Sequence, residues 1–184
     1  MILKLSLIVS IVTFLICAFS FLLMNGNAVH ADRKKAFFER LPRSRVLGSV
    51  LASIALIWTI PNIRPIFEQN SSVQQMVLPF IIVSIVLVCV FLDYLFARAI
   101  AAIFILGAHS LLKFGYPEAG MGYPVFATLI LSIGVIGIIL AAKPYWLRNW
   151  FRLSFTKPVI RYLSAAYFIM NALFSAVFLM DILL

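Results

Sequence analysis

Long apolar stretches alternate with short polar segments along the whole chain. The apolar stretches are rich in Leu, Ile, Val, Phe and Ala, and they cover residues 5–24, 46–60, 76–92, 99–112, 124–142 and 162–184. A helix needs about 20 predominantly apolar residues to cross a bilayer, and the first, fifth and sixth stretches are close to that length. The pattern predicts an all-α membrane protein: a bundle of about six transmembrane helices with short loops, forming a single transmembrane domain over residues 1–184.

The third and fourth stretches need a turn between them. Residues 76–112 contain no Gly or Pro between Pro79 and Gly107. One straight helix over this segment would be about 55 Å long, whereas the hydrocarbon core of a bilayer is about 30 Å thick. The polar break in the segment is residues 93–98, with the sequence DYLFAR. We therefore expect a tight helical hairpin over 76–112, which either spans the membrane twice or is re-entrant.

Positive charges are concentrated in alternate gaps between the apolar stretches. Most of the 15 Lys and Arg residues lie in three of these gaps: Arg33, Lys34, Lys35, Arg40, Arg43 and Arg45, then Arg98, then Lys143, Arg148, Arg152, Lys157 and Arg161. Cytoplasmic loops of membrane proteins carry an excess of Lys and Arg. The pattern predicts that these segments are cytoplasmic and that both termini lie on the outer, periplasmic side of a bacterial inner membrane. It also supports the hairpin, because a single crossing over 76–112 would place residues 143–161 outside.

The first apolar stretch has an alternative interpretation as a secretory signal peptide. Lys4 would form its basic start, and Val29, His30 and Ala31 would form a cleavage site. However, the apolar run of residues 5–24 is longer than the about 7–15 residues usual for a signal peptide. Cleavage would also leave the basic residues that follow on the outer side. We therefore favour an uncleaved transmembrane helix.

The composition excludes a soluble domain as the main body of the protein. Hydrophobic residues make up 64% of the 184 residues, and only 11% are charged, against about 25% charged in a typical soluble domain. The formal net charge of +9 is concentrated in short loops beside apolar stretches. Anionic lipid headgroups or an acidic partner suit that placement better than nucleic acid does. Cys17 and Cys89 lie in apolar runs, which favours small buried side chains over a metal or disulfide site.

Two basic segments resemble helices that lie in the membrane interface. In residues 144–152, Trp146 and Trp150 are four residues apart and share a helix face, while Arg148 and Arg152 share roughly the opposite face. Residues 32–45 mix Phe with basic side chains in a similar way. We expect contacts with lipid headgroups or a partner from Arg33, Lys34, Lys35, Arg40, Arg43, Arg45, Trp146, Arg148, Trp150 and Arg152. An ordinary aromatic belt with topology-determining charges is the alternative.

Few ionisable residues lie within the apolar stretches. Asp93 and Arg98 flank the expected hairpin turn, where we interpret them as a structural pair that holds the turn together. His109 and Asn171 are the remaining candidates for a polar pathway, because polar residues inside a span are functional candidates by default. Small residues at four-residue spacing, such as Gly48 with Ala52 and Gly137 with Ala141, favour close helix packing within the chain or between subunits.

These observations favour a non-catalytic role. The sequence contains no phosphate-binding glycine loop, no zinc spacing and no pair of carboxylates placed for acid–base chemistry, so we expect no enzyme activity, cofactor or metal. The leading hypothesis is a small accessory or structural subunit of a larger membrane protein complex. The alternative is a small transporter or channel subunit for an ion or small solute, which requires a polar path through the bundle. An enzyme that acts on lipid would require a polar cavity open to the bilayer.

Overall fold

The structure is a computed structural model that describes residues 2–24, 31–63, 79–87, 94–116 and 123–183, and this part of the chain is helical with no strand. The helices are α1 (Ile2–Leu23), α2 (Ala31–Arg40), η1 (Leu41–Arg43), α3 (Arg45–Ile63), α5 (Leu95–Gly115), α6 (Tyr123–Ala142), α7 (Tyr145–Thr156) and α8 (Pro158–Leu183). Residues 79–87 are also helical. The predicted all-α class is confirmed.

Among the described residues, four helices are long and apolar enough to cross a membrane. They contain the segments Ser6–Leu23 of α1, Leu95–Lys113 of α5, Tyr123–Ala142 of α6 and Pro158–Asp181 of α8. A fifth candidate is the pair Lys35–Arg43 and Arg45–Thr59, which is bent by 55° at Ser44. Four of the predicted spans, 5–24, 99–112, 124–142 and 162–184, therefore coincide with these four helices, and the predicted span 46–60 lies within α3.

The six-span bundle is not confirmed, and the difference lies in residues 76–92. Within this predicted span residues 79–87 are helical, and the residues on both sides of them lie outside the described part of the chain. Residues 88–93, where the hairpin would turn, lie outside the described part of the chain. Tyr94, directly after them, has a left-handed backbone conformation with φ of 55°. Such a conformation is uncommon for a residue other than Gly and indicates a turn at the start of α5.

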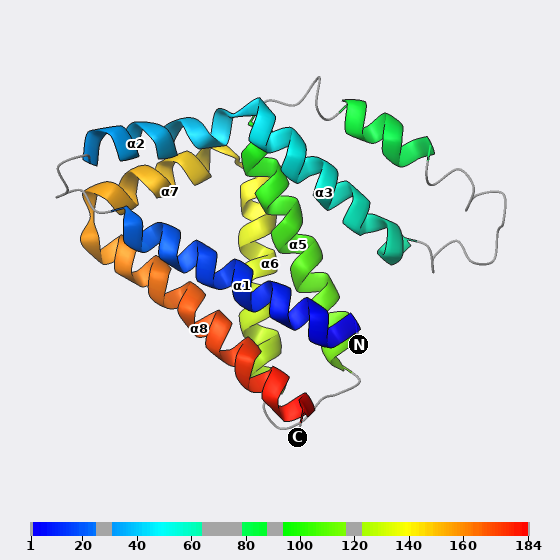
Figure 1. Cartoon of the computed structure of the whole chain (residues 1–184). Helices are drawn as coiled ribbons and strands as arrows, with labels where there is room; N and C mark the ends of the chain where they lie inside the picture. Colours follow the sequence, from blue (N-terminus) through cyan, green and yellow to red (C-terminus); the bar gives the residue numbers. More distant parts are fainter. Residues whose placement is uncertain (1, 25–30, 64–78, 88–93, 117–122, 184) are drawn as a thin grey trace.

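The two basic segments lie at the same end of the bundle. Figure 1 shows α1 and α8 side by side, with α5 and α6 beside them and α3 against α5. Helices α2 and α7 lie next to each other across one end, where α5 begins and α6 ends. The start of α1 and the end of α8 lie towards the opposite end, where α5 ends and α6 begins. The two basic segments, which are far apart in the sequence, thus lie at the same end of the bundle, as the alternation of charge predicts.

The core is held together by aromatic rings centred on Phe168 of α8. Its side chain is 1% exposed, and rings from α1, α5, α7 and α8 surround it. The ring centroids that lie near that of Phe168 are Tyr167 at 5.5 Å, Phe21 at 5.8 Å, Phe104 at 6.2 Å, Trp150 at 6.3 Å and Phe14 at 6.5 Å. Pairs of rings at such distances add to the energy of apolar burial. Phe168 therefore connects α1, α5 and α8, three candidate membrane-spanning helices, to α7 at the end of the bundle.

Two glycines allow close approach of neighbouring helices within the chain. A Cβ atom at Gly48 of α3 would lie 2.7 Å from the backbone nitrogen of Phe96 in α5. A Cβ atom at Gly137 of α6 would lie 2.9 Å from Cγ1 of Ile105 and 3.0 Å from the carbonyl oxygen of Ala101, both in α5. Real Cβ atoms essentially never come this close to other heavy atoms. The small residues predicted to favour helix packing are therefore used inside the chain at these two positions.

Candidate functional site

The basic end of the bundle is built on a buried aromatic contact between α2 and α7. Helix α7 buries Leu147, Phe151, Ser154 and Phe155, which recur at helical spacing on one face. Phe38 of α2 packs against this face, with its ring centroid 5.7 Å from that of Phe151 and 5.8 Å from that of Phe155. The contact fixes α2 and α7 next to each other. The charged side chains of both helices are thereby gathered on one surface.

We call this surface the basic plate, and it consists of α2, η1, α7 and the residues that flank them. Its exposed cationic residues are Arg40, Arg43, Arg45, Lys143, Arg152 and Lys157, and Lys35 and Arg148 are half-buried. Arg33 and Lys34 belong to α2, but their side chains lie outside the described part of the structure. Eight cationic side chains around one end of an apolar bundle produce a strong positive potential there.

Aromatic rings position two of these cations. The Nη2 atom of Arg43 donates to the hydroxyl of Tyr94 at 3.4 Å, and the guanidinium lies 5.7 Å from the centroid of that ring. The ammonium of Lys143 lies 5.3 Å from the ring centroid of Trp146, whose side chain is 44% exposed. Cation–π contacts of this kind restrict a charge without neutralising it. Both cations remain available to anionic groups at the surface.

Trp150 has a structural role that its sequence spacing does not show. Its Nε1 atom donates to the hydroxyl of Ser164 in α8 at 2.9 Å, and its ring centroid lies 5.1 Å from that of Phe21 in α1. The side chain is half-buried, whereas that of Trp146 is exposed. The two tryptophans therefore differ in environment although they are four residues apart. The apolar positions Leu147, Phe151 and Phe155 in the sequence are the signal that indicates the buried face.

Arg161 lies inside α8 rather than in a cytoplasmic loop. Its side chain is 8% exposed, and Nη1 donates to the carbonyl oxygen of Met24 at 3.1 Å, just after the end of α1. Its Nη2 donates to the hydroxyl of Tyr162, and the guanidinium lies 4.7 Å from the centroid of that ring. The last carbonyls of a helix lack partners within the helix, and a cation near them is favourable. Arg161 thereby joins the end of α1 to the beginning of α8.

The structure describes only one member of the predicted pair of Asp93 and Arg98. Asp93 lies outside the described residues, so the pair stays a prediction. Arg98 is half-buried in the first turn of α5, and its Nε atom is buried without a hydrogen-bond partner among the described residues. It lines a cleft of about 200 Å³ between α3 and α5. The side chain therefore faces a space bordered by two helices.

The two residues predicted for a polar pathway lie in different environments. His109 is exposed in the second half of α5, eleven residues after Arg98, and Figure 1 shows that α5 runs away from the basic plate. Asn171 of α8 is 1% exposed, and its Nδ2 atom donates to the carbonyl oxygen of Tyr167 in the same helix at 2.9 Å. An outward-facing imidazole and a buried amide bonded to its own helix do not form a shared site.

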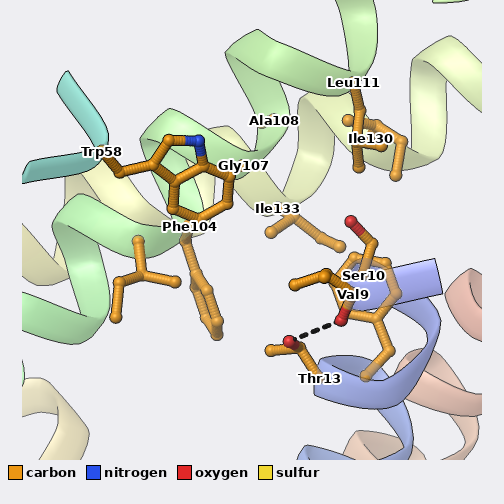
Figure 2. Close-up of a pocket in the computed structure, with 12 residues that line it drawn as sticks. Val9, Ser10, Thr13, Trp58, Phe104, Gly107, Ala108, Leu111, Ile130 and Ile133 are labelled. Carbon is orange, nitrogen blue, oxygen red and sulfur yellow. Dashed lines mark hydrogen bonds between the residues drawn. The ribbon is translucent and has the colours of Figure 1, made fainter. Parts of the chain in front are cut away.

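The cavity between α1, α5 and α6 is small and apolar. Its volume is about 30 Å³, and Trp58 of α3 lies on one side of it. Figure 2 shows Ser10 and Thr13 of α1 at its edge, where the Thr13 hydroxyl donates to the carbonyl oxygen of Val9. The Ser10 hydroxyl donates to the carbonyl oxygen of Ser6. About one water molecule fits in such a volume, and the polar groups beside it are already paired.

A metal-binding cluster is not present among the residues that the structure describes, since no three His, Cys, Asp or Glu side chains lie together there. Comparison with known proteins finds no matching family, no similar curated protein and no similar solved structure. The functional interpretation therefore rests on the geometry and chemistry of this chain alone.

Proposed function

We propose that the protein is a non-catalytic, multi-pass membrane protein that acts as a small accessory or structural subunit of a larger membrane complex. The observation that carries this proposal is the apolar interior of the bundle around Phe168. The small cavity between α1, α5 and α6 is lined mostly by apolar side chains, and the Ser10 and Thr13 hydroxyls at its edge are bonded to their own helix. Such an interior supports a packing role over solute movement, because a transport path needs connected polar groups.

The outer surface of the bundle supports contact with other membrane components. Large apolar side chains are exposed along α1, α3, α6 and α8, among them Phe19, Val50, Ile138 and Leu173. In a bilayer these faces are covered by lipid tails or by the helices of partner subunits. The basic plate offers a complementary surface to anionic headgroups or to an acidic region of a partner.

The proposal includes an orientation and a location. The basic plate faces the cytoplasm of a bacterial inner membrane, and both termini face the periplasm. The support is that the cations of residues 35–45 and 143–157 lie at one end of the bundle. In the proposed six-span arrangement, residues 76–92 add a further crossing or a re-entrant segment before α5. Anionic headgroups then surround the basic plate at the cytoplasmic rim.

Native mass spectrometry of the tagged full chain, extracted gently from its own membrane, tests the subunit role. We expect one protein partner at a fixed stoichiometry with this chain. Charge reversal in the basic plate, Arg40→Glu with Arg152→Glu, should reduce the affinity for the partner by at least about a hundredfold, because two charge-assisted contacts worth roughly 1.5–3 kcal/mol each are lost.

The matched control is Lys113→Glu, which reverses a charge at the opposite end of the bundle. It should leave the partner bound. A chain that is monomeric or only self-associated in its native membrane contradicts the subunit role. In that case flux assays in vesicles with Asp93→Asn and His109→Ala variants test the transporter alternative.

A further inference from the structure

A cleft lies between α3 and α5. The helices are in close contact at Gly48, where a Cβ atom would lie 3.0 Å from the backbone carbon of Leu95. Figure 1 shows that α3 and α5 diverge from this end of the bundle. The cleft lies between them and is lined by Ala52, Ala55, Leu56, Thr59, Leu95, Arg98, Ala99, Ala102 and Leu106. The four alanines leave open the space that larger side chains would fill.

The chemistry of this lining is apolar apart from two side chains. The Thr59 hydroxyl donates to the carbonyl oxygen of Leu56 in its own helix, so it is already paired. Arg98 is therefore the polar group that the cleft offers to a ligand, and its Nε atom has no hydrogen-bond partner among the described residues. A buried nitrogen without a partner is unfavourable, because that N–H group has lost water without gaining an acceptor.

The cleft lies close to further positive charge. Arg98 is in the first turn of α5, and its backbone nitrogen donates to the carbonyl oxygen of Tyr94. The hydroxyl of Tyr94 in turn accepts a hydrogen bond from Arg43 of η1. Arg45, at the start of α3, is exposed at the same end of the bundle. The cleft thus has cations at its basic end and alanine and leucine side chains along its length.

We propose that this cleft binds an anionic phospholipid, with the phosphate held by Arg98 and part of one acyl chain lying between α3 and α5. The volume of about 200 Å³ has room for about seven water-sized groups, which matches a stretch of methylene groups rather than a whole headgroup. A ligand that is negative at one end and apolar along its length complements both features. This site is separate from α7 and does not depend on the proposed subunit role.

The test measures lipid retention by native mass spectrometry on the full chain, purified in mild detergent with phosphatidylglycerol or phosphatidylcholine. We expect phosphatidylglycerol to be retained and phosphatidylcholine to be lost. Arg98→Gln should weaken phosphatidylglycerol binding by about tenfold, since a hydrogen bond to a charged group is worth roughly 1.5–3 kcal/mol. The matched control is Lys113→Gln, which removes a positive charge from the last turn of the same helix, outside the cleft and the basic plate, and should leave binding unchanged. Equal losses in the two variants would overturn the proposal, because they would indicate general attraction to positive charge.

A second variant tests the acyl-chain part of the cleft without altering any charge. Ala102→Phe places a ring in the cleft and should displace the lipid while Arg98 stays in place. Excess glycerol 3-phosphate should not displace it, because the headgroup alone gains nothing from the apolar lining. Displacement by glycerol 3-phosphate, or full retention by Ala102→Phe, would show a site for a free anion and overturn the lipid assignment.

Photolabelling locates the lipid even where a variant fails to fold. The probe is phosphatidylglycerol with a diazirine midway along one acyl chain, added to the unaltered chain. We expect crosslinks to concentrate on Leu56 and Leu106. Labelling spread equally over exposed positions such as Phe19 of α1 and Leu173 of α8 would overturn the proposal, because it would reflect bulk lipid around the bundle.

Discussion

Replacement of Phe168 by Ala should lower the free energy of unfolding by about 3–5 kcal/mol, the usual loss when a fully buried Phe is truncated in a packed core. The ring contacts Phe14, Phe21 and Phe104, so its removal leaves an internal cavity between α1, α5 and α8. Lipid tails do not reach this position, because the side chain is 1% exposed. Reversible unfolding in mixed micelles, followed by circular dichroism, measures the change.

The matched control for this prediction is Phe174→Ala in the same helix. Phe174 is 37% exposed, so lipid or detergent replaces most of the contacts that its ring loses. We expect a loss of no more than about 1 kcal/mol, because a surface site relaxes without an internal cavity. Similar losses for the two variants would contradict the position of Phe168 at the centre of the bundle.

Addition of a single methyl group at Gly48 should separate α3 from α5. In Gly48→Ala, the new Cβ atom would lie 2.7 Å from the backbone nitrogen of Phe96, and a backbone atom cannot move aside as a flexible side chain can. Overpacking of this kind costs about 1–3 kcal/mol. The free energy of unfolding should fall by that amount, although Ala favours a helix more than Gly does.

Gly107→Ala is the matched control for Gly48→Ala. Its new Cβ atom would be 4.0 Å from the nearest described atom outside its own helix, in the Trp58 ring, which is ordinary contact. Here the higher helix propensity of Ala is not offset by a clash, so stability should be unchanged or rise by up to about 1 kcal/mol. If Gly48→Ala were as stable as Gly107→Ala, the close crossing of α3 and α5 would be wrong.

The sequence contained enough information to predict the helical class and most of the candidate spans. Apolar stretches of sufficient length directly indicate helices that cross a bilayer, and α1, α5, α6 and α8 match them. The grouping of the basic segments at one end was also predictable, because they occupy alternate gaps between the apolar stretches. Two crossings separate one such gap from the next and return the chain to the same side. Gly48 and Gly137 were predicted to favour close packing, and the structure identifies α5 as the helix that both of them approach.

Tertiary contacts at the basic end could not be predicted from local spacing. Arg161 was grouped with the loop cations because it follows Lys157 closely in the sequence, yet it is buried against the carbonyl group of Met24. Trp150 was assigned the environment of Trp146 because of their spacing, yet it packs on Phe21. Both contacts join residues more than a hundred positions apart in the sequence. Spacing within one segment carries no information about such partners.

The central claim is that the basic plate faces the cytoplasm while the opposite end of the bundle faces outward. Single cysteines in a Cys17→Ala, Cys89→Ala background, treated with a membrane-impermeant maleimide on intact cells, test it directly. Tyr116→Cys is the outer probe, because Tyr116 is 72% exposed after the end of α5, and Lys157→Cys is the probe of the basic plate, where the native side chain is exposed. We expect Tyr116→Cys to react on intact cells and Lys157→Cys to react only after permeabilisation. The reverse result, or equal reaction at both positions on intact cells, would contradict this account.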